Sequence, residues 1–418
     1  MTQPESRLSR RLGTADAVVV GIGAMVGTGV FVVWAPAADR AGGWLLAGLG
    51  IAAFVAFCNA TSSAALAAVH PQAGGTYVYG RERLGHGWGA LAGYAFVLGK
   101  VASCAAAAHA VGTYVWPDHP KVLAVAAVVT VTAVNLAGVD RTVRATRWLL
   151  GAVLAVLMAV IVVGSAGADR PGLTLDAAHV APFDVLGAAA LLFFAFAGYA
   201  RIATLGEEVR DPARTIPRAV PVALGVVLVL YLAVGATVLL VLGVSGTARS
   251  ERPLAAVAEA VDADWLVPVV TAAAGVAALA ALLALVAGVS RTVFAMADEG
   301  DLPRLLAAVH PTRRVPHRAE AVVGACIIVA VLAGGLVAAL SFSAFAVLLY
   351  YAVANAAALK LHEIERRFPR WLAAAGLASC LLLAASLPLE TVLRGIVALT
   401  VAMALRQIVR SLSARAGS

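Results

Sequence analysis

The chain has 418 residues, of which 62% are hydrophobic and only 13% are charged, and its formal net charge is +8. Soluble domains carry roughly half apolar and about a quarter charged residues, so this composition excludes an ordinary soluble protein. The useful unit for dividing the chain is therefore the membrane span.

Most of the chain falls into charge-free stretches long enough to cross a bilayer. A hydrocarbon core about 30 Å thick needs roughly 20 apolar residues in an α-helix. Eight such stretches occupy residues 17–38, 41–80, 122–139, 148–168, 185–200, 219–248, 265–290 and 371–389. Each of them predicts a span.

Four more spans come from stretches that are longer or less uniform. Residues 88–116 are interrupted only by Lys100, and residues 321–359 are long enough for two spans, with the predicted turn at Ser341-Phe342-Ser343. The last span, residues 391–408, ends near Arg406, whose long stem is expected to reach the headgroups. The sequence thus predicts an all-α membrane protein of about twelve transmembrane helices.

The charged residues between the spans predict the orientation. With a cytoplasmic amino terminus, the cytoplasmic segments hold 24 of the 31 Lys and Arg residues. This asymmetry predicts a multi-pass protein of the cytoplasmic (plasma) membrane with both termini in the cytoplasm, and it explains the basic balance without nucleic-acid binding. Residues 1–411 are expected to form one transmembrane domain and residues 412–418 a short cytoplasmic tail.

Two spans have glycine, a poor helix former, in the middle of the membrane. The first contains Gly21, Gly23, Gly27 and Gly29, and the sixth is short, with Gly198 between aromatic residues. Backbone groups freed in lipid are tolerated only where they line a cavity, and interrupted spans at matching positions point to the binding site of a transporter. Close helix packing of small residues is the alternative for the first span alone, and the pairing with the sixth favours broken helices.

Four collinear segments make the sequence resemble the amino acid, polyamine and organocation transporter superfamily, in its amino acid permease branch. They are residues 21–31, with Gly-Ile-Gly-Ala-Met-Val-Gly-Thr-Gly; residues 71–79, with Pro-Gln-Ala-Gly-Gly-Thr-Tyr; residues 193–217, from Phe-Phe-Ala-Phe-Ala-Gly-Tyr to Asp-Pro-Ala-Arg-Thr-Ile-Pro; and residues 290–303, ending in Gly-Asp-Leu-Pro. The resemblance is specific over roughly the first three quarters of the chain.

The resemblance implies a five-plus-five inverted repeat with broken helices 1 and 6 and two further helices. The repeats would cover residues of about 15–168 and 184–360, and the further helices about 370–411. It also implies alternating access around a substrate held by both breaks. The substrate-binding residues would be Gly23, Ala24, Met25, Gly27, Thr28 and Gly29 from the first span, and Phe194, Ala195, Phe196, Ala197, Gly198 and Tyr199 from the sixth.

The charged segment after the sixth span has two interpretations. Glu207 and Glu208, beside Arg210 and Arg214, are candidates for ion pairs that close an inner gate. A solvated loop with turn residues is the other interpretation, since exposed ion pairs are individually weak.

Lys100 is the one lysine predicted to lie inside the membrane. A charged residue there costs about 2.5 to 3.5 kcal/mol on insertion scales, so it needs a function or a structural partner. Because burial disfavours the ammonium form, Lys100 is a candidate coupling residue that takes up and releases a proton. The alternative is a structural bond to freed carbonyl groups.

The sequence therefore predicts a secondary active transporter of small amino acids or amines, coupled to protons or to exchange. Neutral amino acids are favoured because Ala200 and Arg201 stand where many relatives carry an acidic residue. A polyamine or organocation exporter, and a membrane sensor that binds without translocating, stay open. The absence of a nucleotide loop, a metal cluster or a catalytic constellation predicts no enzyme activity, no cofactor and no metal site, and the oligomeric state is left open.

Overall fold

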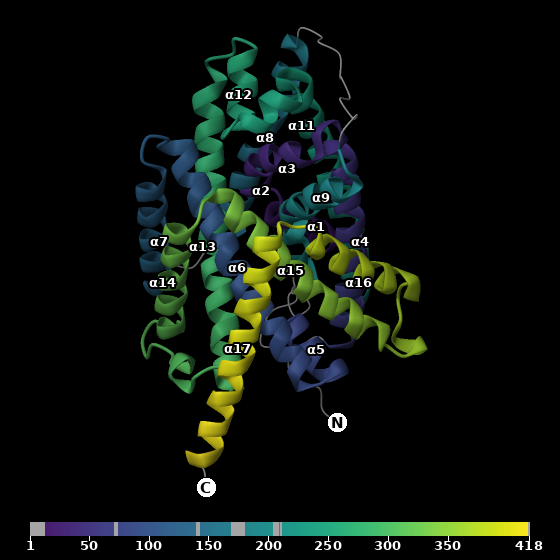
Figure 1. The fold of residues 1–418 in the computed structure, drawn as a ribbon, viewed down its shortest axis with the longest axis vertical. Coiled ribbons are helices and arrows are strands. Elements are labelled where there is room, and N and C mark those ends of the chain that lie inside the picture. The colour runs from purple at the N-terminus through teal and green to yellow at the C-terminus, as the bar shows by residue number, and fades with distance from the viewer. Residues whose placement is uncertain are drawn as a thin grey trace.

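The computed structural model describes residues 13–70, 74–138, 143–168, 180–203, 209 and 211–416, and the regular elements within these ranges are helices (Figure 1). The helices stand in an elongated bundle. Their order is α1 Thr14–Met25, α2 Gly29–Val32, α3 Trp34–Ala41, α4 Leu45–Val69, α5 Thr76–Leu84, α6 His86–Val115, α7 Pro120–Leu136, α8 Val143–Gly167, α9 Pro182–Phe196, α10 Ala200–Ala203, α11 Pro212–Arg249, α12 Pro253–Ala260, α13 Leu266–Asp298, α14 His317–Ala333, α15 Leu336–Leu359, α16 Arg370–Ala385 and α17 Leu389–Ala416.

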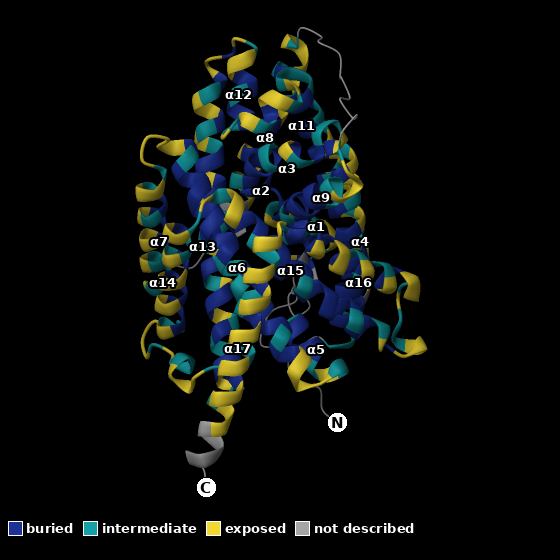
Figure 2. Ribbon diagram, in the orientation of Figure 1, coloured by how far each residue is buried: buried dark blue, intermediate teal, exposed yellow. Residues whose placement is uncertain are grey.

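The predicted fold class is confirmed. Within the described ranges, nine helical stretches are long and apolar enough to cross a membrane. Three shorter helices, α7, α14 and α16, have 16 or 17 residues and fall where the sequence predicts further spans. The buried residues lie mainly in the centre of the bundle (Figure 2). Many large apolar residues are exposed, among them Trp148, Val229 and Leu389. Such a surface suits contact with lipid.

One predicted turn lies elsewhere. Helix α15 runs unbroken through Ser341, Phe342 and Ser343, and the chain turns instead at Gly334 and Gly335, which have extended backbone angles between α14 and α15. The serine hydroxyl groups do not interrupt the helix, because Ser343 is paired with Ser103 of α6 across 2.7 Å. The glycine pair breaks the helix since its backbone loses the most freedom on becoming helical.

Polar contacts between loops agree with the predicted alternation of the spans. Arg83, after the second span, pairs with Glu365, after the tenth, over 2.7 Å. At the opposite end, Arg40, after the first span, donates to the carbonyl of Ser386, after the eleventh. Each contact joins segments that are predicted to share one side of the membrane. Helix α5 and the carboxyl end of α17 lie at one end of the bundle and α12 at the other (Figure 1).

Candidate functional site

The first span is interrupted between α1 and α2. Helix α1 ends at Met25, and α2 begins at Gly29. Between them the Gly27 N–H donates to the Met25 carbonyl over 2.8 Å, a tight turn that is not helical. The N–H groups of Thr28 and Gly29 donate to no residue that the structure describes. The break therefore leaves backbone donors free in the middle of the span, as the glycines predict.

The sixth span is interrupted at the matching place. Helix α9 ends at Phe196, a 3-10 turn occupies Ala197–Tyr199, and the short helix α10 follows. The turn tightens the backbone where the sequence has Gly198 between aromatic residues. The two predicted breaks are thus both present in the structure.

The two breaks touch each other, although they are far apart in the sequence. A Cβ atom at Gly198 would lie 2.1 Å from the carbonyl oxygen of Ala24, and one at Gly29 would lie 2.7 Å from the Cα of Ala195. Both distances are far below contact and both involve backbone atoms, which cannot rotate away. Glycine at these positions is what lets the backbones of the two spans meet.

A tyrosine from the seventh span closes part of the freed backbone. The Tyr231 hydroxyl, on α11, donates to the Met25 carbonyl at 2.8 Å and also lies 3.2 Å from the Ala195 carbonyl. Its ring packs edge-on against Phe196. Tyr231 therefore binds the last turn of both α1 and α9. The sequence did not predict this role, because a lone tyrosine in an apolar span carries no recognisable pattern.

The centre of the crossing keeps some accessible surface. Ala24 is exposed, and Gly23, Gly27, Phe194 and Gly198 are half-buried, whereas Met25, Val26, Thr28, Phe193, Ala195, Ala197 and Tyr199 are buried. Because Ala24 lies directly against Gly198, this accessible surface borders both breaks.

A buried hydroxyl at the break has no partner. Thr28 is only 4% exposed, and its Oγ1 makes no hydrogen bond within the described residues. The buried Tyr199 hydroxyl lies beside Tyr351 without a hydrogen bond of normal geometry. Buried polar atoms without a partner are rare in native proteins, and such an atom can be satisfied by a group from outside the chain. The twelve predicted substrate residues thus form two segments that meet, with unpaired donors between them.

Lys100 lies on α6, one helical turn before the buried Cys104. Its neighbour Gly99 packs tightly against Ala346 and Val347 of α15. Lys100 is half-buried, and it forms no hydrogen bond or ion pair with a described residue. The structural alternative, a bond to freed carbonyl groups, therefore has no support among the described contacts.

The predicted inner-gate residues fall largely outside the described part of the chain. Glu207, Glu208 and Arg210 belong to the ranges that the structure does not describe. Arg214 approaches Asp211 at 3.8 Å, with both side chains well exposed. Such a pair contributes little, so the proposed gate at this segment stays a prediction.

A different ionic cluster, centred on Asp301, ties four segments together at the α5 end. Its carboxylate accepts from Tyr77 of α5 at 2.8 Å and from Arg406 of α17 at 2.7 Å, and Arg410 lies 3.1 Å away. The Tyr94 hydroxyl of α6 donates to the Asp301 carbonyl at 2.5 Å. Burial, with the hydrogen bond to Asp301, raises the pKa of Tyr77 and keeps it a donor.

This cluster corrects the prediction for Arg406. Its side chain does not reach out to the headgroups, because Arg406 is 4% exposed and is paired with Asp301, which is 3% exposed. Sequence analysis identified the segment of Asp301 only through the family resemblance, and the pair joins residues 105 positions apart.

Two further ionic contacts surround α5. Arg81 pairs with Glu299 at 2.5 Å, and Arg83 donates to both His70 and Glu365. The hydrogen bond from Arg83 lowers the pKa of Glu365 to about 2. Burial, followed by the charge of Arg83, lowers the pKa of His70, so its neutral ring accepts the Arg83 hydrogen bond. Helix α5 is thus fixed to the ends of α4, α13 and the segment after α15.

Within the described residues, two interrupted spans meet inside an apolar helical bundle and leave unpaired backbone donors where they cross, the arrangement expected of a membrane carrier. No group of three or more metal-type side chains occurs in the described residues.

The chain belongs to the amino acid permease family, whose family model matches residues 16–415. It is 53% identical over 412 residues to an uncharacterized transporter of Mycobacterium bovis, covering 98% of this chain and 93% of that protein. It is 26% identical over 354 residues to the branched-chain amino acid permease BcaP of Bacillus subtilis, covering 76% and 73% of the two chains. It is 28% identical over 346 residues to the human cationic amino acid transporter 4, covering 75% of this chain and 53% of that protein. The protein is therefore a multi-pass membrane transporter rather than an enzyme.

Proposed function

We propose that this transporter carries amino acids with neutral side chains across the cytoplasmic membrane by alternating access, coupled to protons or to exchange. The observation that carries the proposal is the set of unpaired donors at the crossing: the Thr28 hydroxyl and the N–H groups of Thr28 and Gly29. The units that move against each other would be the two repeats, residues 15–168 and 184–360.

The free donors suit the carboxylate of an amino acid. Backbone N–H groups at the start of a helix attract anions through their own dipoles and that of the helix behind them. Helix α2 continues through Val33, which has helical backbone angles, into α3. The carbonyl groups at the carboxyl ends of α1 and α9 carry the negative end of each helix dipole. They are therefore suited to the ammonium group of an amino acid.

The side chains around the crossing favour a neutral substrate. Phe194, Phe196 and Tyr199 supply aromatic surface, and the described residues of the two breaks, 21–31 and 193–203, include no carboxylate. Many relatives carry an acidic residue directly after the glycine-aromatic pair of the sixth span, where this chain has Ala200 and Arg201. The name of the branched-chain permease relative agrees with a neutral substrate, while that of the cationic transporter relative represents the alternative.

We assign the coupling step to Lys100. Lys100 is half-buried, and its amino group has no hydrogen-bond or ion-pair partner among the described residues, so it is free to exchange a proton or to approach an anionic substrate group. The test compares Lys100→Ala with Lys121→Ala, a matched removal of a lysine from the start of α7.

The deciding experiment is uptake into proteoliposomes of purified protein, with and without an imposed proton gradient. Leucine and arginine serve as the neutral and cationic probes. We expect gradient-driven leucine uptake that Lys100→Ala abolishes and Lys121→Ala preserves. Saturable leucine binding without any flux would show that the protein is a sensor and not a carrier. Preferred uptake of arginine or spermidine would establish a cationic substrate.

Thr28→Val tests the binding site separately from coupling. Valine has the shape of threonine without the hydroxyl, so the variant removes an unsatisfied buried group whose desolvation costs about 1 to 3 kcal/mol. We expect the empty protein to become slightly more stable while leucine binds at least about tenfold more weakly, since one hydrogen bond to a charged group is lost. Unchanged leucine affinity would remove Thr28 from the site.

A further inference from the structure

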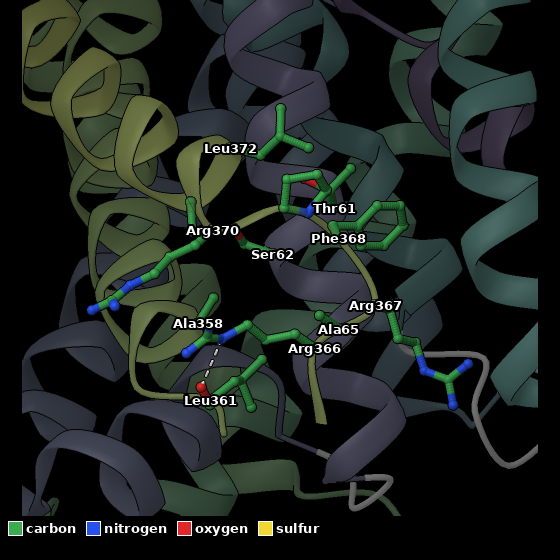
Figure 3. Close-up of a pocket in the computed structure, with 12 residues that line it drawn as sticks. Thr61, Ser62, Ala65, Ala358, Leu361, Arg366, Arg367, Phe368, Arg370 and Leu372 are labelled. Carbon is green, nitrogen blue, oxygen red and sulfur yellow. Dashed lines mark hydrogen bonds between the residues drawn. The ribbon is translucent and has the colours of Figure 1, made fainter. Parts of the chain in front are cut away.

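A cleft opens between α4, the end of α15 and the start of α16. It is shallow and open to its surroundings, with an internal volume of about 20 Å³. Its lining includes Thr61 and Ser62 of α4 and three arginines at and just before the start of α16, namely Arg366, Arg367 and Arg370 (Figure 3). None of its described lining residues belongs to α1, α2 or α9, whose ends form the crossing.

Among the described residues that line the cleft, the charged ones are arginines, and none carries a carboxylate. Glu365, the nearest acidic residue in the sequence, is held by Arg83 at 2.7 Å. Arg366 donates its Nε to the Leu361 carbonyl over 3.0 Å, which orients the guanidinium and leaves its terminal N–H groups without an acceptor in the described part of the chain. Arg370 is exposed and has no polar partner there.

The arginine side chains diverge from the connecting segment. In the close-up, Arg366 and Arg370 extend to the same side of the cleft and Arg367 to the other (Figure 3). Arginine presents its donors in a planar fork that matches phosphate oxygens, and two forks on one side suit a single phosphate group.

The surroundings of the cleft are apolar and exposed. Trp371 is 60% exposed at the start of α16, Leu381 and Leu382 are exposed farther along the same helix, and Ile364 beside the arginines is 100% exposed. Helix α16 has 16 residues, a length of about 24 Å, which is shorter than the hydrocarbon core. The long arginine stems at this end can reach the headgroups, and tryptophan favours the same depth.

We propose that this cleft binds the headgroup of an anionic phospholipid, with Arg366 and Arg370 on the phosphate and the acyl chains along the exposed face of α16. Basic pockets between transmembrane helices recognise such headgroups. A free phosphate ion would use the same arginines but would gain nothing from the adjoining apolar face.

The test is native mass spectrometry of the full-length protein, delipidated and then incubated with phosphatidylglycerol or phosphatidylcholine. We expect phosphatidylglycerol to be retained preferentially, and the triple variant Arg366→Gln, Arg367→Gln, Arg370→Gln to retain at least about tenfold less of it. Arg370→Gln alone, an exposed change that leaves the fold intact, is expected to lose about fivefold, which corresponds to ~1 kcal/mol per arginine.

The matched control removes three arginines from another loop at the same end of the bundle: Arg304→Gln, Arg314→Gln and Arg318→Gln. These lie between α13 and α14, or at the start of α14, and do not line the cleft. Equal loss of phosphatidylglycerol in this control, or equal retention of both lipids by the native chain, would overturn the proposal. Displacement of the lipid by millimolar inorganic phosphate would assign the cleft to a free anion instead.

Discussion

Asp301→Asn is expected to destabilise the protein more than any exposed charge change, because it removes the anion on which two helices and two arginines depend. The Asp301 carboxylate lies 2.7 Å from Arg406 and 2.8 Å from the Tyr77 hydroxyl. Removing one partner of a buried ion pair leaves the other charge uncompensated and costs about 3 to 5 kcal/mol. Arg410 is 42% exposed, so its loss adds at most about 1 kcal/mol.

The free energy of unfolding can be compared in mixed dodecyl maltoside and SDS micelles. Arg406→Gln and the double variant with Asp301→Asn complete a double-mutant cycle, and we expect a coupling energy of about 2 to 3 kcal/mol between the two sites. The control is Glu390→Gln, which breaks a pair with Arg394 on the same helix α17. Both of its side chains are more than 60% exposed, and the expected cost is below about 1 kcal/mol.

Two results would refute this reasoning. One is a cost for Asp301→Asn no larger than that for Glu390→Gln. The other is an additive double variant, which would mean that Asp301 and Arg406 stabilise the fold independently and that α17 is held by its apolar packing alone.

Three further changes test the crossing and the contacts around α5. Gly198→Ala places a Cβ 2.1 Å from a backbone oxygen and is expected to abolish leucine uptake. The control Gly288→Ala meets no atom within 4 Å and should leave uptake near native. Equal uptake by the two variants would contradict the close contact between the two breaks. Tyr231→Phe removes the hydroxyl that binds both half-helices and should lower the free energy of unfolding by about 1 to 3 kcal/mol, with a change below 0.5 kcal/mol counting against it. Burial lowers the pKa of His70, so the folded protein favours the neutral ring, and the stability that this contributes is present above about pH 6.5 and is lost below it. The melting temperature should therefore fall between about pH 7.5 and pH 5.5, and His70→Gln should reduce that fall. An unchanged fall in the variant would refute this role of His70.

The apolar runs predicted the spans because a bilayer imposes length and hydropathy on each helix independently of its neighbours. The breaks were also predictable, since glycine lowers helix propensity where lipid offers the backbone no alternative partner. The turn between α14 and α15 was predicted at Ser341-Phe342-Ser343, which is wrong, because a serine in a membrane helix can satisfy its hydroxyl on a neighbouring helix. Ser343 does so with Ser103, and no local pattern in the sequence reveals that partner.

Long-range polar contacts were the part of the site that the sequence could not predict. The sequence marks Arg406 as a basic residue at the end of a span, where snorkelling is the usual outcome. Its partner Asp301 lies in another loop, and only the packing of α17 against α6 and α15 brings the two together. Tyr231 escaped prediction for the same reason: its role depends on two carbonyl groups from different spans.

Some backbone groups at the crossing already have hydrogen-bond partners and others do not, and this difference distinguishes amino acids from amines as substrates. Carbonyl groups near the breaks already accept hydrogen bonds: Tyr231 binds that of Met25, Trp34 that of Val30 and Tyr114 that of Phe31. The N–H groups of Thr28 and Gly29 are unpaired within the described residues. The crossing therefore offers unmet donors for an anion and carbonyl acceptors that are already partly occupied.

A substrate without a carboxylate would leave these donors buried and unpaired. Each unmet donor costs about 1 to 3 kcal/mol, so we expect isoamylamine, which is leucine without its carboxyl group, to bind about 30-fold more weakly than leucine or worse. Isothermal titration of the purified protein in detergent checks this, and Thr28→Val should narrow the gap by weakening leucine alone. Equal affinity for the two ligands would place recognition in the carbonyl groups and would favour the organocation alternative.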